Sequence, residues 1–247
     1  MNTATPRALV VIPARYGSTR LPAKALALIG GIPMVVRVLQ QARRMTTASR
    51  VIVATDHHRI ADAVQAAGGE AMMTSPDHPS GTDRVAEVTR KIPCEYVVNI
   101  QGDEPFIDPL AVDAAVEALH ASPSCNMSTI CVEVGIEEAR DPAVTKVTRD
   151  LNGYALYFSK ALIPHDRDGA PPGAIIEKHL GVYVFRRDFL LQYAAWEPTP
   201  LERREKLEQL RALERGERIL VVTAARDSLG IDTQHDLDRA NALAVKD

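Results

Sequence analysis

The chain alternates short apolar runs, of the kind that form buried β-strands, with amphipathic helical patterns over its first hundred residues. Strand-like runs occur at residues 8–12, 50–55, 70–74 and 95–100, and helical patterns lie between them at 33–44, 58–68 and 83–91. Strands and helices that alternate in this way form right-handed βαβ units, with a parallel sheet covered by helices on both faces. The sequence therefore predicts an α/β fold with a mostly parallel sheet, whose functional loops follow the carboxyl ends of the strands.

The second half of the chain departs from this alternation after Val134. Residues 144–150 and 154–160 have the composition of two strands joined by a tight turn at 151–153, which predicts a small antiparallel insertion. Residues 163–173 are rich in proline and charge, which is typical of a loop. We expect one domain over residues 1–247, with an inserted lobe at about residues 135–200.

Prolines and caps indicate where several helices begin. Pro33 is expected as the first residue of the 33–44 helix. Thr199 and Glu202 match a capping box for a helix that starts at Pro200 and ends near Gly216. A strand at 219–224 and a closing helix at 235–245 complete the chain. The buried face of the helix after Thr199 is expected to contain Leu201, Leu207, Leu210 and Leu213.

Charge and composition exclude several classes of partner. The 247 residues carry a net charge of -3, so the chain has no overall positive field to attract nucleic acid or an anionic membrane. No apolar run approaches the roughly 20 residues that a helix needs to cross a bilayer. Cys94, Cys125 and Cys131 form no CxxC pair, which fits buried thiols in a reducing compartment. We expect a cytoplasmic protein in which any anion site is local.

A basic loop of residues 13–24 follows the first strand directly. It reads PARYGSTRLPAK and contains neither a Walker A motif nor a dinucleotide fingerprint. Arg15 and Arg20 offer planar guanidinium groups, Lys24 offers a compact charge, and Gly17 permits close approach of the backbone. These features favour a site for nucleotide phosphates at the carboxyl end of the strand. The alternative is an ordinary surface loop with solvated arginines.

Asp103 and Asp232 are candidate magnesium ligands. Asp103 and its neighbour Glu104 follow the strand at 95–100 and should reach the same sheet edge as the basic loop. Asp103 is the better candidate, because Mg²⁺ prefers one or two carboxylates together with phosphate oxygens and water. Asp232 could reach the same edge from the loop before the last helix. The alternatives are that Asp103 caps the helix that starts near Pro109, and that Asp232 is a polar loop residue.

Other polar positions give weaker signals. Residues 80–84, SGTDR, form a loop-to-helix junction that could hold a ribose or base, although Ser80 could equally be an ordinary helix N-cap. Arg167, His179 and Tyr183 could face a polyhydroxylated acid, although a single histidine is more often structural. His57 and His58 are expected to face solvent. The seven histidines show no paired metal-ligand spacing, and no G-x-S-x-G hydrolase signature is present.

Eight segments, in order along the chain, resemble one family: the cytidylyltransferases that activate 3-deoxy-D-manno-octulosonate (Kdo), the acidic sugar of the lipopolysaccharide inner core. The segments are IPARYGSTRLPAK, VATDH, SGTDR, VNIQGDEP, GYALYFS, KHLGVY, PLERREKLEQLR and GIDT, and they span residues 12–233. The resemblance implies a Rossmann-like nucleotide-diphospho-sugar transferase fold with an inserted lobe that forms a homodimer. It also implies CTP and Kdo as substrates: the anomeric hydroxyl of Kdo attacks the α-phosphorus of CTP, and pyrophosphate leaves.

The resemblance further implies roles for individual residues. Arg15, Lys24, Asp103 and Asp232 would be catalytic, with Asp103 and Asp232 as ligands of Mg²⁺. Two magnesium ions are implied, one that orients the β- and γ-phosphates and one that lowers the pKa of the attacking hydroxyl. The implied nucleotide-binding residues are Pro13, Ala14, Arg15, Ser18, Lys24, Ser80, Gly81, Arg84, Gln101 and Asp103. The implied sugar-binding residues are Arg20, Gln101, Arg167, His179, Tyr183, Glu208 and Gln209, with Arg167 beside the sugar carboxylate.

Some positions depart from the family pattern. Ala23 stands where glycine is common, and His165 stands where tryptophan is usual. The segment 226–229 differs too, so the sugar side is less well defined than the nucleotide side. An 8-amino Kdo analogue therefore stays open as the substrate.

Other functions are less well supported. Another acidic sugar such as sialic acid is disfavoured by KHLGVY and LEQLR. A glycosyltransferase would be expected to carry a D-x-D triplet at the end of a strand, and none is found at an expected strand end. A non-catalytic nucleotide-sugar sensor has no evident need for Lys24, Asp103 and Asp232 together.

Overall fold

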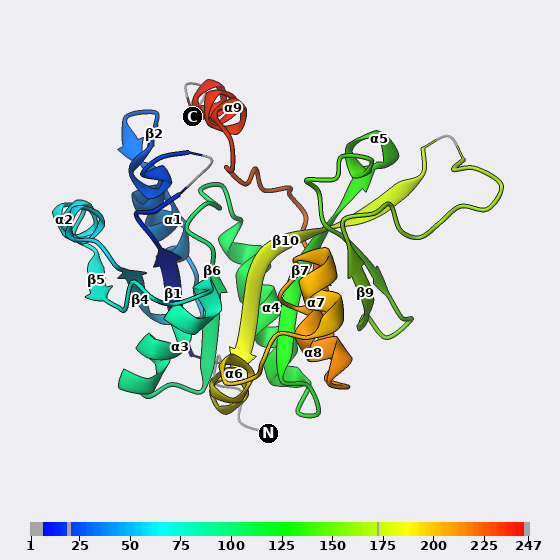
Figure 1. Ribbon diagram of the computed structural model, residues 1–247, viewed down its shortest axis with the longest axis horizontal. Helices are drawn as coiled ribbons and strands as arrows, with labels where there is room; N and C mark the ends of the chain where they lie inside the picture. The colour runs from blue at the N-terminus through cyan, green and yellow to red at the C-terminus, as the bar shows by residue number, and fades with distance from the viewer. Residues whose placement is uncertain (1–6, 19–20, 172, 245–247) are drawn as a thin grey trace.

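The computed structural model describes residues 7–18, 21–171 and 173–244. Its centre is a sheet in the order β11-β7-β10-β6-β1-β4-β5 (Figure 1). Neighbouring strands are parallel except β10, which runs antiparallel to both β6 and β7. The α/β fold and the mostly parallel sheet are confirmed, whereas β7 and β10 were not predicted as strands. The strands are β1 (Ala8–Ala14), β4 (Ala48–Thr55), β5 (Glu70–Met73), β6 (Tyr96–Ile100), β7 (Met127–Gly135), β10 (Ile175–Arg186) and β11 (Ile219–Thr223).

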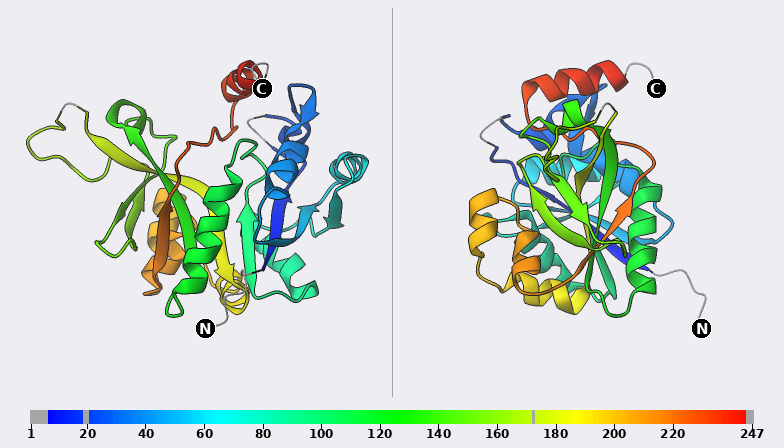
Figure 2. Two further views of the ribbon diagram at one scale, coloured as in Figure 1. Left: turned by 180° about the vertical axis from the view of Figure 1, so that it is seen from behind. Right: turned by 90° about the vertical axis from the view of Figure 1, so that its right-hand side faces the viewer.

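Helices cover both faces of the sheet, and the alternation of side chains along β1 shows how (Figure 2). Val10 and Ile12 belong to a buried cluster with α1 (Met34–Ala42), α2 (His58–Ala66) and α4 (Pro109–Ala121). Leu9 and Val11 belong to a second cluster with α3 (Gly81–Lys91), α6 (Arg187–Ala194) and α8 (Leu210–Glu214). Each strand residue therefore contributes to one of two cores, as expected for a sheet that is buried on both sides.

The antiparallel hairpin after Val134 is confirmed. It consists of β8 (Lys146–Arg149) and β9 (Ala155–Ser159), follows the short helix α5 (Ile136–Ala139), and continues the central sheet through the pairing of Lys146 with Lys178 of β10. The chain between β9 and β10 projects away from the body (Figure 1). Within the expected lobe, β10 is long enough to pair with β8 of the hairpin at one end and with β6 of the central sheet at the other.

Two sequence-based boundaries need correction. Pro33 ends the short strand β3 (Ile32–Pro33), which pairs with β2 (Leu28–Ile29), and α1 begins one residue later. The capping box of Thr199 and Glu202 is present, but the helix that it starts is interrupted. Lys206 adopts a left-handed conformation with φ of 58°, so the segment forms α7 (Pro200–Glu205) and α8, and Leu201 stays 37% exposed. The last helix is α9 (Gln234–Ala244), and its expected end at Val245 lies outside the described residues.

Two sequence-based exclusions can be compared with the described residues. No helix there is long and apolar enough to cross a membrane. Cys125 and Cys131 are buried free thiols as expected, whereas Cys94 is only partly buried.

Ala23 adopts a left-handed backbone with φ of 51°, just before the 3-10 helix η1 (Lys24–Leu26). A side chain in this region of the Ramachandran map costs about 1 kcal/mol, which glycine avoids. We therefore expect Ala23→Gly to raise the free energy of unfolding by about 0.5 kcal/mol, after the larger backbone entropy of glycine in the unfolded chain is subtracted. Urea denaturation measures the difference.

Ala25→Gly is the matched control, because Ala25 lies within η1 and has no positive φ. It should lower the free energy of unfolding. A loss of stability in Ala23→Gly as large as in the control would contradict the assignment of strain to position 23.

Candidate active site

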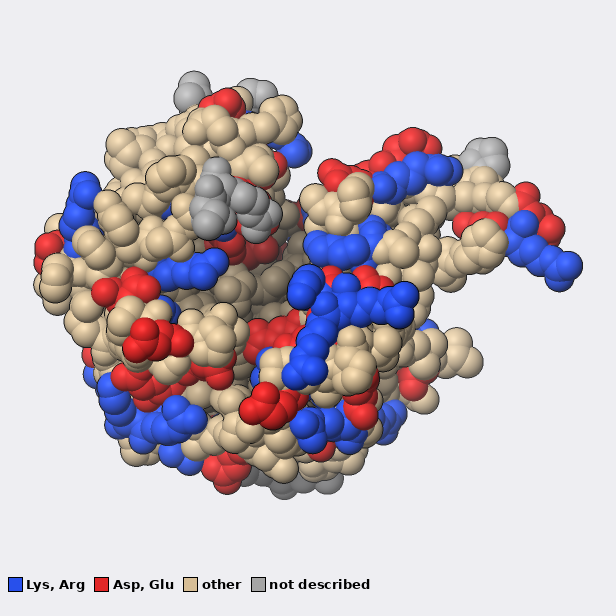
Figure 3. Space-filling model, in the orientation of Figure 1, with Lys and Arg blue, Asp and Glu red and all other residues tan. Residues whose placement is uncertain are grey.

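A pocket of about 330 Å³ opens where the loops after β1 and β6 meet the start of α3. The space-filling view shows a hollow on this face, with acidic groups on its floor and basic groups along one rim (Figure 3). All ten residues expected to bind the nucleotide line the pocket, and so does Asp232. The lining residues are Pro13, Ala14, Arg15, Ser18, Lys24, Ala25, His78, Pro79, Ser80, Gly81, Arg84, Gln101, Gly102, Asp103 and Asp232.

Lys24 lies between the two acidic candidates. Its Nζ donates to Asp103 Oδ2 at 2.6 Å and to Asp232 Oδ1 at 2.8 Å. Burial lowers the pKa of Lys24, but the two carboxylates outweigh burial and raise the pKa above its ordinary value. Two loops far apart in sequence, those of Asp103 and Asp232, therefore converge on the ammonium of Lys24 in η1. Asp103 does not cap α4, because Asp108 occupies the N-cap and accepts from the backbone N–H of Leu110.

The loop after β6 lies against the start of the basic loop, and Gly102 makes this possible. A Cβ on Gly102 would lie 2.8 Å from the carbonyl oxygen of Pro13, closer than a real Cβ contact allows. Gly17 differs, because a Cβ there would meet nothing within 4 Å. The protein's own packing therefore requires glycine at position 102 and not at position 17.

Glu104 connects the β6 loop to the segment that carries Asp232. Ser228 Oγ donates to Glu104 Oε2 at 2.7 Å, and the backbone N–H of Ile231 donates to the carbonyl oxygen of Asp103 at 2.9 Å. Burial raises the pKa of Glu104 to about 7. These contacts fix the loops of Asp103 and Asp232 relative to each other.

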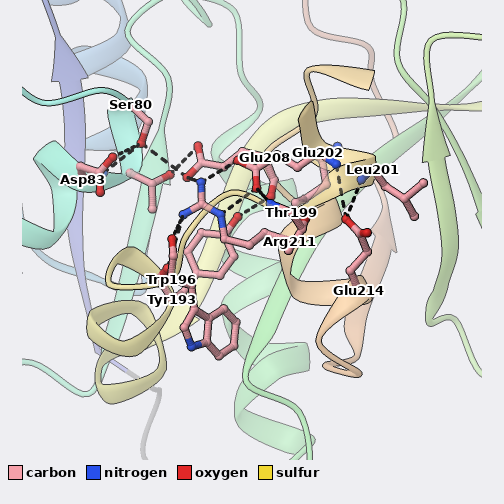
Figure 4. A network of polar contacts seen from close by, with 12 residues as sticks. Ser80, Asp83, Tyr193, Trp196, Thr199, Leu201, Glu202, Glu208, Arg211 and Glu214 are labelled. Carbon is pink, nitrogen blue, oxygen red and sulfur yellow. Dashed lines mark hydrogen bonds and ion pairs between the residues drawn. The ribbon is translucent and has the colours of Figure 1, made fainter. Parts of the chain in front are cut away.

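Ser80 is both a helix cap and a pocket residue. Its Oγ accepts from the backbone N–H of Asp83 at 3.2 Å, as the N-cap alternative predicts. The same Oγ donates to Asp83 Oδ2 at 2.7 Å and lies 3.5 Å from Glu208 Oε1 (Figure 4). Arg211 anchors this wall, because its guanidinium pairs with Glu202 and also donates to the carbonyl oxygens of Tyr193 and Trp196.

A chain of polar contacts leads from the pocket to Glu208. Gln101 Nε2 donates to Asn99 Oδ1 at 2.9 Å, and Asn99 Nδ2 donates to Thr82 Oγ1 at 3.3 Å. Thr82 Oγ1 in turn donates to Glu208 Oε2 at 3.1 Å. Gln101 and Glu208, both expected near the sugar, therefore belong to one connected network.

His179 and Tyr183 lie on β10 beside this network. Thr129 Oγ1 has one proton, which it donates to the carbonyl oxygen of Val182 at 2.6 Å. His179 Nε2 lies 2.8 Å from the same Oγ1 and must therefore be the donor in that contact. Burial lowers the pKa of His179 to about 3, so the ring is neutral and its Nδ1 is an acceptor.

Gln209 has an unsatisfied buried group. Tyr183 OH donates to Gln209 Oε1 at 2.9 Å, whereas Gln209 Nε2 is buried without a hydrogen-bond partner among the described residues. A buried N–H without a partner costs free energy unless a ligand satisfies it. Gln209 is only 2% exposed, so its hydrogen bonding among the described residues is incomplete in a closed part of the structure.

The predicted arginines of the site differ in what the structure shows of them. Arg167 is exposed on the loop between β9 and β10, which projects away from the body (Figure 1). Arg20 lies outside the described residues. Arg15 lines the pocket but is itself exposed. His57 was expected to face solvent, yet it is partly buried at the N-cap of α2, whereas His58 is exposed.

Three residues that build the site were not singled out in the sequence. Asp56 directly follows β4 and Asn99 is the penultimate residue of β6, so their places at strand ends could have found them. Ser228 lies in the segment between β11 and α9, and no sequence pattern marks it.

No group of three or more histidine, cysteine, aspartate or glutamate side chains suited to hold a metal occurs in the part of the chain that the structure describes. Any metal at Asp103 and Asp232 would therefore need further ligands from a substrate or from water.

Comparison with known proteins places these features in a family. Residues 9–219 match the family model described as cytidylyltransferase. The protein is 49% identical over 242 residues to a 3-deoxy-manno-octulosonate cytidylyltransferase of Trichlorobacter lovleyi, covering 94% of this chain and 96% of the relative. It is 49% identical over 241 residues to the protein of the same name from Serratia proteamaculans, with the same coverage.

A solved CMP:2-keto-3-deoxy-manno-octonic acid synthetase in complex with CTP matches with a TM-score of 0.91 and 40% identity, covering 97% of this chain and 99% of that one. The 4-diphosphocytidyl-2C-methyl-D-erythritol synthase of Anaerococcus prevotii, at 15% identity and a TM-score of 0.64, covers 97% of this chain and 96% of that one and shares the fold. This chain therefore belongs to the 3-deoxy-manno-octulosonate cytidylyltransferase family.

Proposed function

We propose that this protein transfers CMP from CTP to Kdo, for lipopolysaccharide synthesis, with release of pyrophosphate. The observation that carries the proposal is the convergence of the ten expected nucleotide-binding residues and Asp232 on one pocket. The family membership agrees with this function, and the solved relative in complex with CTP supports the choice of nucleotide.

The chain's own residues supply positioning and charge. Arg15 and Lys24 neutralise the triphosphate, while Ser80, Gly81 and Arg84 line the side of the pocket toward the nucleoside. The Kdo hydroxyl forms a bond to the α-phosphorus as the bond to the pyrophosphate oxygen breaks, and the hydroxyl proton leaves to solvent. Holding the two substrates in line converts a bimolecular reaction into one within a complex.

We propose Asp103 and Asp232 as the ligands of Mg²⁺. The two carboxylates already converge on a cation, the Lys24 ammonium, and hard carboxylate oxygens are the donors that Mg²⁺ prefers. Bound there with CTP, Mg²⁺ would neutralise phosphate charge and lower the pKa of a bound hydroxyl.

The sugar side is supported by Gln101, Glu208, His179, Tyr183 and Gln209. Polar groups of these five side chains lie in connected contacts beside the pocket, and amide, carboxylate, hydroxyl and imidazole groups suit a polyhydroxylated ligand. Arg20 and Arg167 stay proposals for the sugar carboxylate. An 8-amino analogue would present an ammonium in place of one hydroxyl and is the alternative substrate to test.

We also propose a homodimer formed through the β8-β9 extension. Leu156 on β9 and Ile175 at the start of β10 are each 62% exposed, and β9 is an edge strand that pairs with β8. An exposed apolar edge of this kind favours association with a second copy. Light scattering from the purified protein, with one chain at 26.9 kDa, measures the assembly.

Pyrophosphate release tests the reaction. The purified protein is mixed with CTP, Mg²⁺ and Kdo, and reactions with UTP, with sialic acid, with the 8-amino analogue and without Mg²⁺ run in parallel. Release that needs CTP, Kdo and Mg²⁺ together supports the proposal. Release only with another acidic sugar would keep the nucleotide assignment and change the acceptor.

Asp103→Asn tests the metal site. The amide retains shape but removes the negative charge, so we expect kcat to fall by about a hundredfold or more. Asp238→Asn, a carboxylate on the exposed face of α9, is the matched control and should keep wild-type turnover. Near-normal turnover in Asp103→Asn would remove the proposed role of this carboxylate.

Glu208→Gln tests the electrostatics of the sugar side. Burial raises the pKa of Glu208 to about 7, although 26% of the side chain is still exposed. The folded state therefore binds more protons than the unfolded state between the ordinary pKa of a glutamate and about 7, and stability falls as pH rises through this window. The variant lacks this titration, so its stability relative to wild type should increase from pH 5 to pH 8.

Urea denaturation at both pH values gives the comparison. Glutamine keeps the volume of the side chain and an oxygen that can accept from Thr82. Parallel pH profiles for the two proteins would show that Glu208 titrates alike in the folded and unfolded states.

A further inference from the structure

The residues after β4 contact two walls of the pocket, although no role has been given to them. The segment VATDH resembles the family, and Asp56 is the first residue beyond the carboxyl end of β4. Strands β4 and β1 are parallel and in register, with Thr55 paired to Ala14. Asp56 therefore emerges beside the start of the basic loop.

The carboxylate of Asp56 joins the basic loop to α3. Its Oδ1 accepts from the backbone N–H of Tyr16 at 3.0 Å, and its Oδ2 accepts from Arg84 at 3.1 Å. The side chains of Asp56 and Arg84 are only 14% and 4% exposed. Water therefore screens the ion pair less than it would at the surface, and the geometry of the pair is well defined.

Arg84 depends on two partners for its position in the pocket wall. One nitrogen of its guanidinium donates to Thr74 Oγ1 at 2.5 Å, and another donates to Asp56. A planar guanidinium held at two nitrogens has its plane and its remaining N–H groups fixed. Asp56 is the negatively charged partner of the Arg84 guanidinium, and Thr74 is the neutral one.

Tyr16 fixes the path of the basic loop. Its ring stacks on His57 with centroids 3.9 Å apart, and its hydroxyl accepts from Arg59 at 2.8 Å. Together with the bond from its N–H to Asp56, these contacts hold Tyr16 against the start of α2. The pocket residues Arg15 and Ser18 lie on either side of Tyr16 in the chain, so their positions depend on this anchor.

We propose that Asp56 is a positioning residue for the nucleotide: it sets the separation between the basic loop and Arg84. This inference rests on the proposed function, because it takes the pocket to be the CTP site. Asp56 does not line the pocket, so it acts through Tyr16 and Arg84.

Asp56→Asn is the test. Asparagine keeps an oxygen that can accept from Tyr16, but it faces Arg84 without a negative charge. We expect the KM for CTP to rise about tenfold, the loss associated with one charge-assisted hydrogen bond. The KM for Kdo and kcat should change by less than about twofold, because the ion pair lies on the nucleotide side. Asp62→Asn, an exposed carboxylate on α2, is the matched control and should leave all three constants unchanged.

A double-mutant cycle with Arg84→Met distinguishes failure of the Asp56 proposal from failure of the nucleotide-pocket assignment. If Asp56 acts through Arg84, Asp56→Asn should add little to the KM for CTP in the Arg84→Met background. An equal increase in both backgrounds, or an unchanged KM for CTP in Asp56→Asn, would overturn the proposal. Arg84→Met with wild-type affinity for CTP would instead contradict the nucleotide pocket itself.

Thermal unfolding checks that each variant folds. If Asp56→Asn does not fold, Arg84→Lys gives the same test, because lysine keeps the charge but cannot bond to Thr74 and Asp56 as a planar fork. Arg84→Lys should also raise the KM for CTP with little change in kcat. A wild-type KM for CTP in that variant would show that the fixed guanidinium is not required.

Discussion

The Lys24 ammonium, held between Asp103 and Asp232, is the contact on which the arrangement of the site depends. It joins a residue of η1 to the loop after β6 and to the loop before α9, which are 79 and 208 residues away in the chain. Without this cation, two carboxylates would face each other in a partly enclosed pocket, and their repulsion would separate the loops. Two further contacts hold these loops. Gly102 packs on the backbone of Pro13, and Ser228 donates a hydrogen bond to Glu104. Contacts within the protein therefore fix the relative positions of these segments.

The parallel arrangement of β1, β4 and β6 explains why residues so distant in sequence meet. The carboxyl ends of these strands lie at one edge of the sheet, and each delivers a different chemical group. The segment after β1 provides cations, and the segment after β6 provides a carboxylate. The segment after β4 provides Asp56, which accepts a hydrogen bond from the backbone of Tyr16. In open α/β sheets, ligand sites are generally built from loops that follow the carboxyl ends of several strands.

Sequence reasoning could predict what depends on local pattern and strand order. The α/β class, the β8-β9 hairpin, the capping box at Thr199 and the approach of Asp103 to the basic loop follow from such patterns. The pattern left open whether Asp232 reaches the same edge, which the structure shows that it does. It could not predict features that depend on long-range packing. The central antiparallel strand β10 has no helical or hairpin signal, and the helix break at Lys206 occurs at a residue without turn preference. Likewise, nothing in VATDH alone indicates that Asp56 reaches both Tyr16 and Arg84, because each contact crosses between elements.

The charges around Lys24 also indicate how the proposed nucleotide site can accept its ligands. Asp103 and Asp232 both accept from the Lys24 ammonium, so the two carboxylates already gather positive charge at this edge of the sheet. A divalent cation held by the same two carboxylates would add to that positive charge. Arg15 and Lys24 line the same pocket and would supply further positive charge to phosphate oxygens. Acidic and basic side chains at one site therefore serve the same ligand, because the carboxylates suit a cation that accompanies the phosphates and the cationic side chains suit the phosphates themselves.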